Sequence, residues 1–133
     1  MRLSRQMLRS EFIKKVALIS GEDISTCYQC GKCSAGCPLE AEMGILPHRV
    51  LRLLQLGREE EALDFQAIWL CASCHTCESR CPKGFDLSRV MEALRVIRLR
   101  SGHEALRLEE LPAEVLARAP QQAIVSRYRK YTG

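Results

Sequence analysis

Eight cysteines are the residues of this sequence best suited to chemistry, and they fall into two tight groups. Each group has the spacing Cys-x-x-Cys-x-x-Cys-x-x-x-Cys-Pro, and the second group begins 44 residues after the first. The groups are Cys27, Cys30, Cys33 and Cys37 with Pro38, and Cys71, Cys74, Cys77 and Cys81 with Pro82. This repeat predicts two copies of one small structural unit.

Cysteines at this spacing are typical of a 4Fe–4S cluster in bacterial ferredoxins. Three thiolates on a tight loop can reach three irons of one cube, while the backbone N–H groups between them turn toward its anionic sulfurs. The fourth cysteine precedes a proline that forces the chain away, so it is better placed to reach the neighbouring cube. Two clusters need eight thiolates, and the sequence supplies eight.

The cysteine pattern therefore predicts crossed ligation with pseudo-twofold symmetry. Each cluster takes three cysteines from one loop and the last cysteine of the other group. Cluster 1 is assigned to Cys27, Cys30, Cys33 and Cys81, and cluster 2 to Cys71, Cys74, Cys77 and Cys37.

Three other uses of the cysteines compete with electron transfer. A zinc ribbon needs only four ligands per ion, so the third and fourth cysteines of each group would be surplus. Disulfides between such close neighbours would be strained, and the sequence shows no signal peptide for an oxidising compartment. A purely structural role for the clusters is the third alternative.

Apolar residues at helical spacing predict the elements that position the two loops. The stripes are Leu8, Phe12, Val16 and Ile19; Val50, Leu51 and Leu54; and Leu87, Val90, Met91, Leu94 and Ile97. Gly21 is expected to end the first helix, Pro47 to open the second, Gly57 to stop it, and Asp86 to cap the third. No segment of useful length alternates with period two, so the fold class is all-α.

A further helix of about three turns is predicted from Arg58 to Leu70, with Leu63, Ile68 and Trp69 buried. Two histidines near the loops are interpreted without a ligand role, because each loop already supplies its cysteines. His75 is expected to donate to a cluster sulfur or face solvent, since a lone histidine is not a Rieske pair. His48 is expected at a helix start, and His103 in a surface turn.

The composition of the 133 residues predicts one compact, soluble protein, with 47% apolar and 27% charged residues. Only 5% are aromatic, so metal ligation is expected to help stabilise the small core. A net charge of +4 is too mild to imply nucleic acid. The sequence shows neither an apolar run of the roughly 18 residues that would span a bilayer nor a signal peptide, so a cytoplasmic location without a transmembrane segment is expected.

Two regions are expected along the chain. Residues 1–100 form the helical dicluster domain, with its motifs at 27–38 and 71–82. Residues 101–133 form a C-terminal extension in which Pro112 and Pro120 break the helical register. Its basic, aromatic end consists of Arg127, Tyr128, Arg129, Lys130 and Tyr131. We interpret this extension as a docking segment for a partner protein; the alternatives are a frayed, solvated tail and a contact with an anionic membrane or nucleic acid.

The segments TCYQCGKCSAGCP, LCASCHTCESRCP and DLSRVMEALR, with the helical stretch between them, resemble the α-helical dicluster ferredoxin family. The resemblance covers roughly residues 10–100. The helix-filled spacing of 44 residues departs from the small β-containing bacterial ferredoxins. Within the helical family, the chain is most similar to the C subunits of heterodisulfide reductases and their homologues in related complexes.

This resemblance implies an α-helical ferredoxin with two 4Fe–4S clusters held in loops between helices. It further implies a relay that takes electrons from a flavin-containing A-type subunit and passes them to a disulfide-reducing B-type subunit. No residue of this chain is expected to be catalytic, because all eight cysteines are assigned and no phosphate loop or Ser/His constellation is present. The alternatives are a free-standing soluble dicluster ferredoxin, or the iron–sulfur relay subunit of another dehydrogenase or sulfur-oxidising complex.

Basic residues beside the loops are the features expected to adjust this relay. They are Lys32, Arg80 and Lys83. Positive charge there can raise the potential of a cluster or dock a partner, and the alternative is that all three are ordinary solvated charges.

Overall fold

The computed structural model describes residues 10–101 and 107–129, and every regular element in these ranges is helical. The predicted all-α fold class is therefore confirmed. The chain divides into two compact units, Met1–Gly102 and His103–Gly133. Leu8, predicted on a helix stripe, and His103, predicted in a turn, lie outside the described residues.

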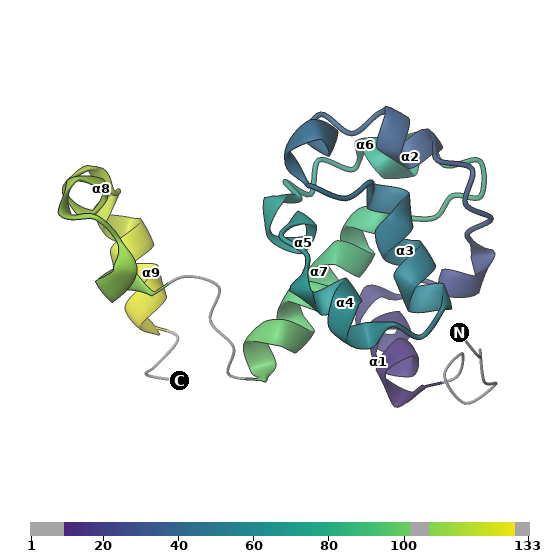
Figure 1. Ribbon diagram of the computed structural model, residues 1–133, viewed down its shortest axis with the longest axis horizontal. Helices are drawn as coiled ribbons and strands as arrows, with labels where there is room; N and C mark the ends of the chain where they lie inside the picture. Colours follow the sequence, from purple (N-terminus) through teal and green to yellow (C-terminus); the bar gives the residue numbers. More distant parts are fainter. Residues whose placement is uncertain (1–9, 102–106, 130–133) are drawn as a thin grey trace. The chain divides into compact units, whose positions relative to one another are not determined.

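The first unit contains both cysteine groups and nine short helical elements among its described residues (Figure 1). They are α1 (Glu11–Ser20), η2 (Ile24–Thr26), α2 (Lys32–Ala35), η3 (Glu40–Glu42), α3 (Pro47–Gln55), α4 (Glu59–Asp64), α5 (Ala67–Leu70), α6 (Thr76–Ser79) and α7 (Leu87–Arg100). The short helices α2 and α6 pack against each other at the opposite end of this unit from α1 (Figure 1).

The predicted helix ends are confirmed by their backbone geometry. Gly21 ends α1 with φ 73°, a left-handed conformation that glycine adopts without steric cost. Pro47 occupies the first turn of α3, where its missing N–H removes no helical hydrogen bond. Gly57 follows that helix with φ 70°, and the Asp86 side chain caps α7 by accepting from the Ser88 N–H.

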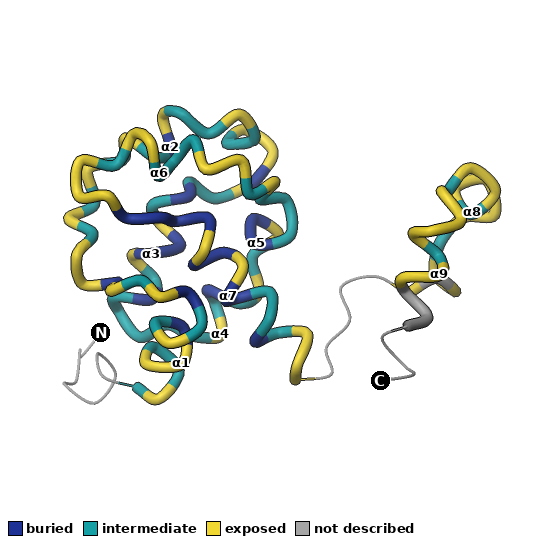
Figure 2. The backbone as a smooth tube through the Cα atoms, turned by 180° about the vertical axis from the view of Figure 1, so that it is seen from behind, coloured by how far each residue is buried: buried dark blue, intermediate teal, exposed yellow. Residues whose placement is uncertain are grey.

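Helix α7 is the centre of the core and packs against α1, α3, α4, α5 and α6. All five residues of its predicted stripe are buried, as are the three predicted for α3. Figure 2 shows the buried backbone running through α3, α5 and α7. The two cysteine loops lie outside this core, each connected to it by the helices that flank it.

The prediction of a single helix from Arg58 to Leu70 is wrong, because the helix breaks into α4 and α5 at Phe65, whose backbone is extended. Residues five apart on one helix point about 140° apart, so a continuous helix could not bury both Ala62 and Ala67 on one side. The break buries both. Among the predicted core residues Ile68 is buried, whereas Leu63 and Trp69 are only half-buried.

The second unit contains η4 (Leu108–Glu110), α8 (Ala113–Arg118) and α9 (Gln121–Arg129). Pro112 precedes α8 and Pro120 precedes α9, so both prolines separate helices as expected. The side chains of its basic, aromatic end lie outside the described residues. Over the described parts of both units, no helix is long and apolar enough to cross a bilayer.

Two candidate iron–sulfur sites

The two cysteine loops repeat the same unusual backbone turns. Gln29 and Ser73, which precede the second cysteine of each group, have φ 63° and 51°. Gly31 and His75, which follow that cysteine, have φ 77° and 57°. Non-glycine residues rarely adopt positive φ, so three such residues at matched positions indicate that the cysteine spacing imposes one loop geometry on both halves.

A short helix follows each loop at the matched position. Helix α2 begins at Lys32 and α6 at Thr76, directly after the left-handed residue of each loop. The first turn of each helix carries the third cysteine of its group. Because α2 packs against α6, the two loops are neighbours, and the fourth cysteine of each group lies just beyond this contact.

In the first loop, Gln55 at the end of α3 fixes the backbone of the first cysteine. Its Nε2 donates to the carbonyl oxygens of Cys27 at 2.7 Å and Ile24 at 3.0 Å. Its Oε1 accepts from Gln29 Nε2 at 3.2 Å, and the same Gln29 nitrogen lies 3.6 Å from Cys27 Sγ. These bonds connect the loop to the core helix that follows it.

In the second loop, Arg95 on α7 has the corresponding role. Its Nη1 donates to the carbonyl oxygen of Cys71 at 2.8 Å, and its Nη2 donates to Ser73 Oγ at 3.0 Å. Glu92 pairs with the same guanidinium at 2.6 Å. Sequence reasoning missed both Gln55 and Arg95, because a polar residue on an amphipathic helix carries no signal that it reaches a distant carbonyl.

Two small cavities open beside the loops. The first-loop cavity is lined by Cys27, Cys30, Cys33 and Cys81, with Tyr28, Gly31, Lys32, His48, Leu51, Lys83, Phe85 and Leu87. The second-loop cavity is lined by Cys37, Cys71, Cys74 and Cys77, with Cys33, Pro38, Leu39, Met43, Pro47, Ala72, His75, Thr76, Leu87, Ser88 and Met91. Each cavity thus brings three cysteines of one group together with the last cysteine of the other.

The outermost cysteine of each loop is exposed and is stabilised as a thiolate. The Lys32 backbone N–H and the Tyr28 hydroxyl lower the pKa of Cys30. The Thr76 hydroxyl, whose Oγ1 lies 3.4 Å from the Cys74 sulfur, and the Thr76 backbone N–H lower the pKa of Cys74. Because thiolates are the form that binds iron, these contacts prepare both sulfurs as ligands.

Three of the half-buried cysteines, Cys27, Cys33 and Cys77, behave in the opposite way. Burial raises the pKa of Cys27 and of Cys33, and the nearby Cys81 sulfur adds to the effect at Cys27. Burial together with the negative charge of Asp86 raises the pKa of Cys77 to about 11. These sulfurs are therefore protonated near neutral pH unless a cation replaces the proton, as a coordinated metal does.

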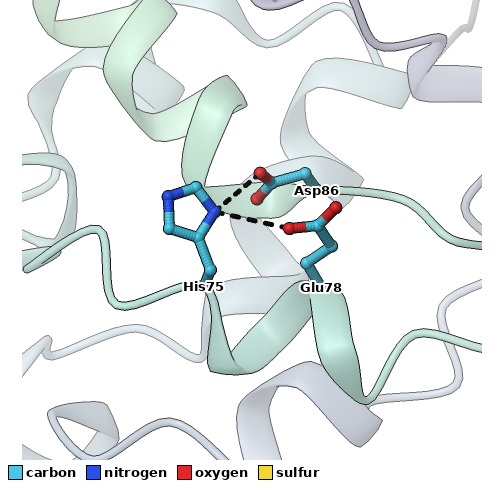
Figure 3. A group of neighbouring side chains, drawn as sticks. All are labelled: His75, Glu78 and Asp86. Carbon is cyan, nitrogen blue, oxygen red and sulfur yellow. Dashed lines mark hydrogen bonds and ion pairs between the residues drawn. The ribbon is translucent and has the colours of Figure 1, made fainter.

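The imidazole of His75 lies against acidic groups rather than in the ligand set (Figure 3). Its Nδ1 is 2.9 Å from Asp86 Oδ2, 3.1 Å from Ser88 Oγ and 3.4 Å from Glu78 Oε2. Burial works to raise the pKa of Asp86, but hydrogen bonds from Ser88 and His75 outweigh it and lower that pKa. The sequence indicated Asp86 as a helix cap but gave no sign of its contact with His75.

His48 occupies the first turn of α3, as expected. Its backbone N–H donates to Ser34 Oγ at 3.0 Å, and its Nδ1 lies 2.8 Å from the same oxygen. The ring fills the space beside Gly31, where an added Cβ would lie 3.8 Å from His48 Cε1. Each cavity thus has one histidine in its wall, supplied by different elements.

The residues of both cavities fit a 4Fe–4S cluster chemically. Each cavity gathers at least four cysteines, whose sulfurs are the ligands of such clusters, and neither lining includes a carboxylate. Apolar side chains form much of the remaining wall, including Leu87, which lines both cavities. Thiols at two such sites can hold metal and, through it, exchange electrons.

Comparison with known proteins agrees with this chemistry. A family model for the 4Fe–4S dicluster domain matches residues 26–86, which include all eight cysteines. One relative is the C-type iron–sulfur subunit, numbered 2, of the CoB–CoM heterodisulfide reductase of Methanocaldococcus jannaschii. It is 35% identical over 111 residues, which are 80% of this chain and 59% of the relative.

Two further relatives have similar names. The C-type subunit of the ferredoxin:CoB–CoM heterodisulfide reductase of Methanosarcina mazei is 34% identical over 108 residues, covering 79% of this chain and 66% of the relative. The C-type iron–sulfur subunit of the CoB–CoM heterodisulfide reductase of Methanopyrus kandleri is 33% identical over 82 residues, which are 62% of this chain and 43% of the relative. The chain therefore spans less than two thirds of the length of each of these relatives.

Proposed function

We propose that this chain, which belongs to the 4Fe–4S dicluster family of heterodisulfide reductase C subunits, relays single electrons through two clusters inside a larger oxidoreductase complex. The observation that carries the proposal is the pair of neighbouring cavities, each of which gathers three cysteines of one group and the last cysteine of the other. Cys33 and Leu87 line both cavities, so the two sites are separated by little more than one layer of side chains.

Crossed ligation is part of this proposal. The lining of the first-loop cavity by Cys81 and of the second-loop cavity by Cys37 supports it. The effect of the Cys81 sulfur on the pKa of Cys27 is a second support. Each cluster then connects both halves of the chain, across the contact between α2 and α6.

In this proposal the clusters, when bound, supply the sites that gain and lose one electron. The chain supplies everything else. Its cysteine sulfurs fix the two positions, while Gln55 and Arg95 hold the loop backbones in place. Leu51, Phe85 and Leu87 exclude water from the inner wall of the first-loop cavity, and burial of this kind adjusts a reduction potential.

The proposed partners are a flavin-containing A-type subunit that delivers electrons and a B-type subunit that uses them to reduce a disulfide. The names of the relatives state that they are subunits of heterodisulfide reductases, and this supports the presence of partner chains. The second unit is proposed as a docking segment for one of them. Eight thiols without a disulfide fit a reducing, cytoplasmic location.

Anaerobic purification tests the proposal. We expect close to eight irons and eight acid-labile sulfides per chain, reduction by dithionite, and reoxidation by an artificial acceptor. Disulfide reduction should require copurifying subunits. Disulfide turnover by the purified chain alone, stoichiometric zinc, or a reproducible value near four irons would contradict it. A stable monomer that serves several enzymes would instead identify a free-standing ferredoxin.

A further inference from the structure

We infer that the two sites are electrostatically unequal, so that cluster 1, beside the first loop, accepts the first electron when the chain is reduced. This inference rests on the proposed function. It follows from charged residues at positions where the matched loops differ, because a charge close to a cluster changes the free energy of adding an electron.

Two lysines line the first-loop cavity, Lys32 and Lys83, and both are exposed. Neither has an ion-pair partner within residues 10–101 and 107–129, the part of the chain that the structure describes. Their charge is therefore available to stabilise an electron added to cluster 1.

The matched positions of the second loop carry no charge. Forty-four residues separate the two groups, so Thr76 corresponds to Lys32 and Leu39 corresponds to Lys83. Both Thr76 and Leu39 line the second-loop cavity. The repeat thus provides an internal comparison in which two lysines beside one site are replaced by two neutral side chains beside the other.

The charges that line or back the second-loop cavity are paired or negative, whereas Arg80, whose side chain lies against Gly36, adjoins a cysteine of each proposed cluster, Cys37 and Cys81. Arg95 is paired with Glu92 at 2.6 Å, so its charge is largely cancelled. Buried Asp86 lies behind the cavity wall, and Glu78 approaches the same Nδ1 of the His75 ring that Asp86 does. Arg89 lies 3.5 Å from the Asp86 carboxylate.

These charges act in the same direction. Unpaired cations stabilise the reduced form of cluster 1, whereas the paired and acidic groups give cluster 2 no comparable stabilisation. Solvent and salt screen exposed lysines, so the gap between the two potentials should narrow as ionic strength rises. The one-electron reduced chain therefore carries its electron mainly beside the first loop.

A reductive titration followed by electron paramagnetic resonance tests this ordering on the full chain with both clusters. The double variant Lys32→Thr with Lys83→Leu copies the residues of the second loop into the first. We expect the higher-potential reduction step to shift downward and the lower-potential step to stay unmoved. The matched control is Lys14→Thr with Lys15→Leu on α1, which removes two exposed lysines away from both cavities and should move neither step.

The reciprocal variant is Thr76→Lys, which adds a cation at the matched place in the second loop. It should raise the lower-potential step and narrow the gap. A shift of the lower step in the Lys32/Lys83 variant, or no shift of either step, would overturn the inference. Iron content is measured first on every sample: fewer than eight irons in the unsubstituted chain contradicts the proposed function itself, and is thereby distinguished from a wrong order of potentials.

Discussion

In both cysteine loops the residue after the second cysteine has a left-handed backbone, yet it is Gly31 in the first loop and His75 in the second. The carbonyl of the first cysteine accepts a hydrogen bond from neutral Gln55 in one half and from cationic Arg95 in the other. The loops therefore share a backbone and differ in the side chains that surround it. This difference teaches that cysteine spacing determines the backbone of the loop, while the neighbouring side chains remain free to set the electrostatic environment of its sulfurs.

Removal of the clusters should have the largest effect of the changes predicted here, because it should destabilise both halves of the first unit. With few aromatic residues and two loops outside the core, the chain is expected to gain part of its folding free energy from metal ligation. We expect the cluster-free chain to lose its cooperative thermal transition, measured by near-ultraviolet circular dichroism and calorimetry under anaerobic conditions. A cluster-free chain with an unchanged transition would show that the helices alone determine the fold.

Removing the backbone support of one loop should affect that loop alone. Arg95→Ala removes charge-assisted bonds worth about 1.5–3 kcal/mol each, and Gln55→Ala removes neutral bonds worth about 1 kcal/mol each. Each variant should speed loss of visible cluster absorption in urea, Arg95→Ala more than Gln55→Ala. Arg52→Ala, at an exposed position of α3, is the control. Equal effects on both clusters would contradict independent support of the loops.

Exchange of the left-handed residues should have a smaller effect. Gly31→Ala places a side chain at φ 77° without a clash and should cost about 1–2 kcal/mol through the backbone alone. His75→Gly relieves a similar strain but loses the contact with Asp86, so its net effect should be smaller. The urea unfolding midpoints of the cluster-loaded variants provide the measurement. A larger decrease in the midpoint for His75→Gly than for Gly31→Ala would mean that the two loops do not share this backbone strain.

The contact between the two halves should tolerate an added methyl group at Gly36. A Cβ on Gly36 would meet the side chain of Arg80, which is exposed and can move aside. Gly36→Ala should therefore change the urea midpoint by less than Gly31→Ala does. A decrease in the urea midpoint at least as large as that of Gly31→Ala would show that the Arg80 side chain is held firmly across the interface of the two halves.

The sequence predicted the features that depend on spacing. The stripe of α7, its Asp86 cap, Pro47 at the start of α3 and the all-helical class follow from periodicity and end signals, and the structure confirms them. The break at Phe65 was not predictable, because it depends on which faces of α4 and α5 meet the core.

The surroundings of the sites depend on contacts between residues distant in sequence. Gln55 lies 28 residues from Cys27 and Arg95 lies 24 residues from Cys71, so no local pattern joins them. The partnership of His75 with Asp86 likewise spans 11 residues and needs the second loop to fold back onto the start of α7. The two cysteine groups were readable from the sequence, whereas the surroundings of their sulfurs required the fold.

Crossed ligation is tested most directly by two double cysteine variants, read by iron content and by electron paramagnetic resonance of each cluster. If each cluster takes the last cysteine of the other group, Cys77→Ser with Cys81→Ser damages both clusters. Cys77→Ser with Cys37→Ser then damages cluster 2 alone. The opposite result, in which the Cys77/Cys81 variant loses one cluster and the Cys37/Cys77 variant loses both, would show sequential ligation and contradict the crossed arrangement.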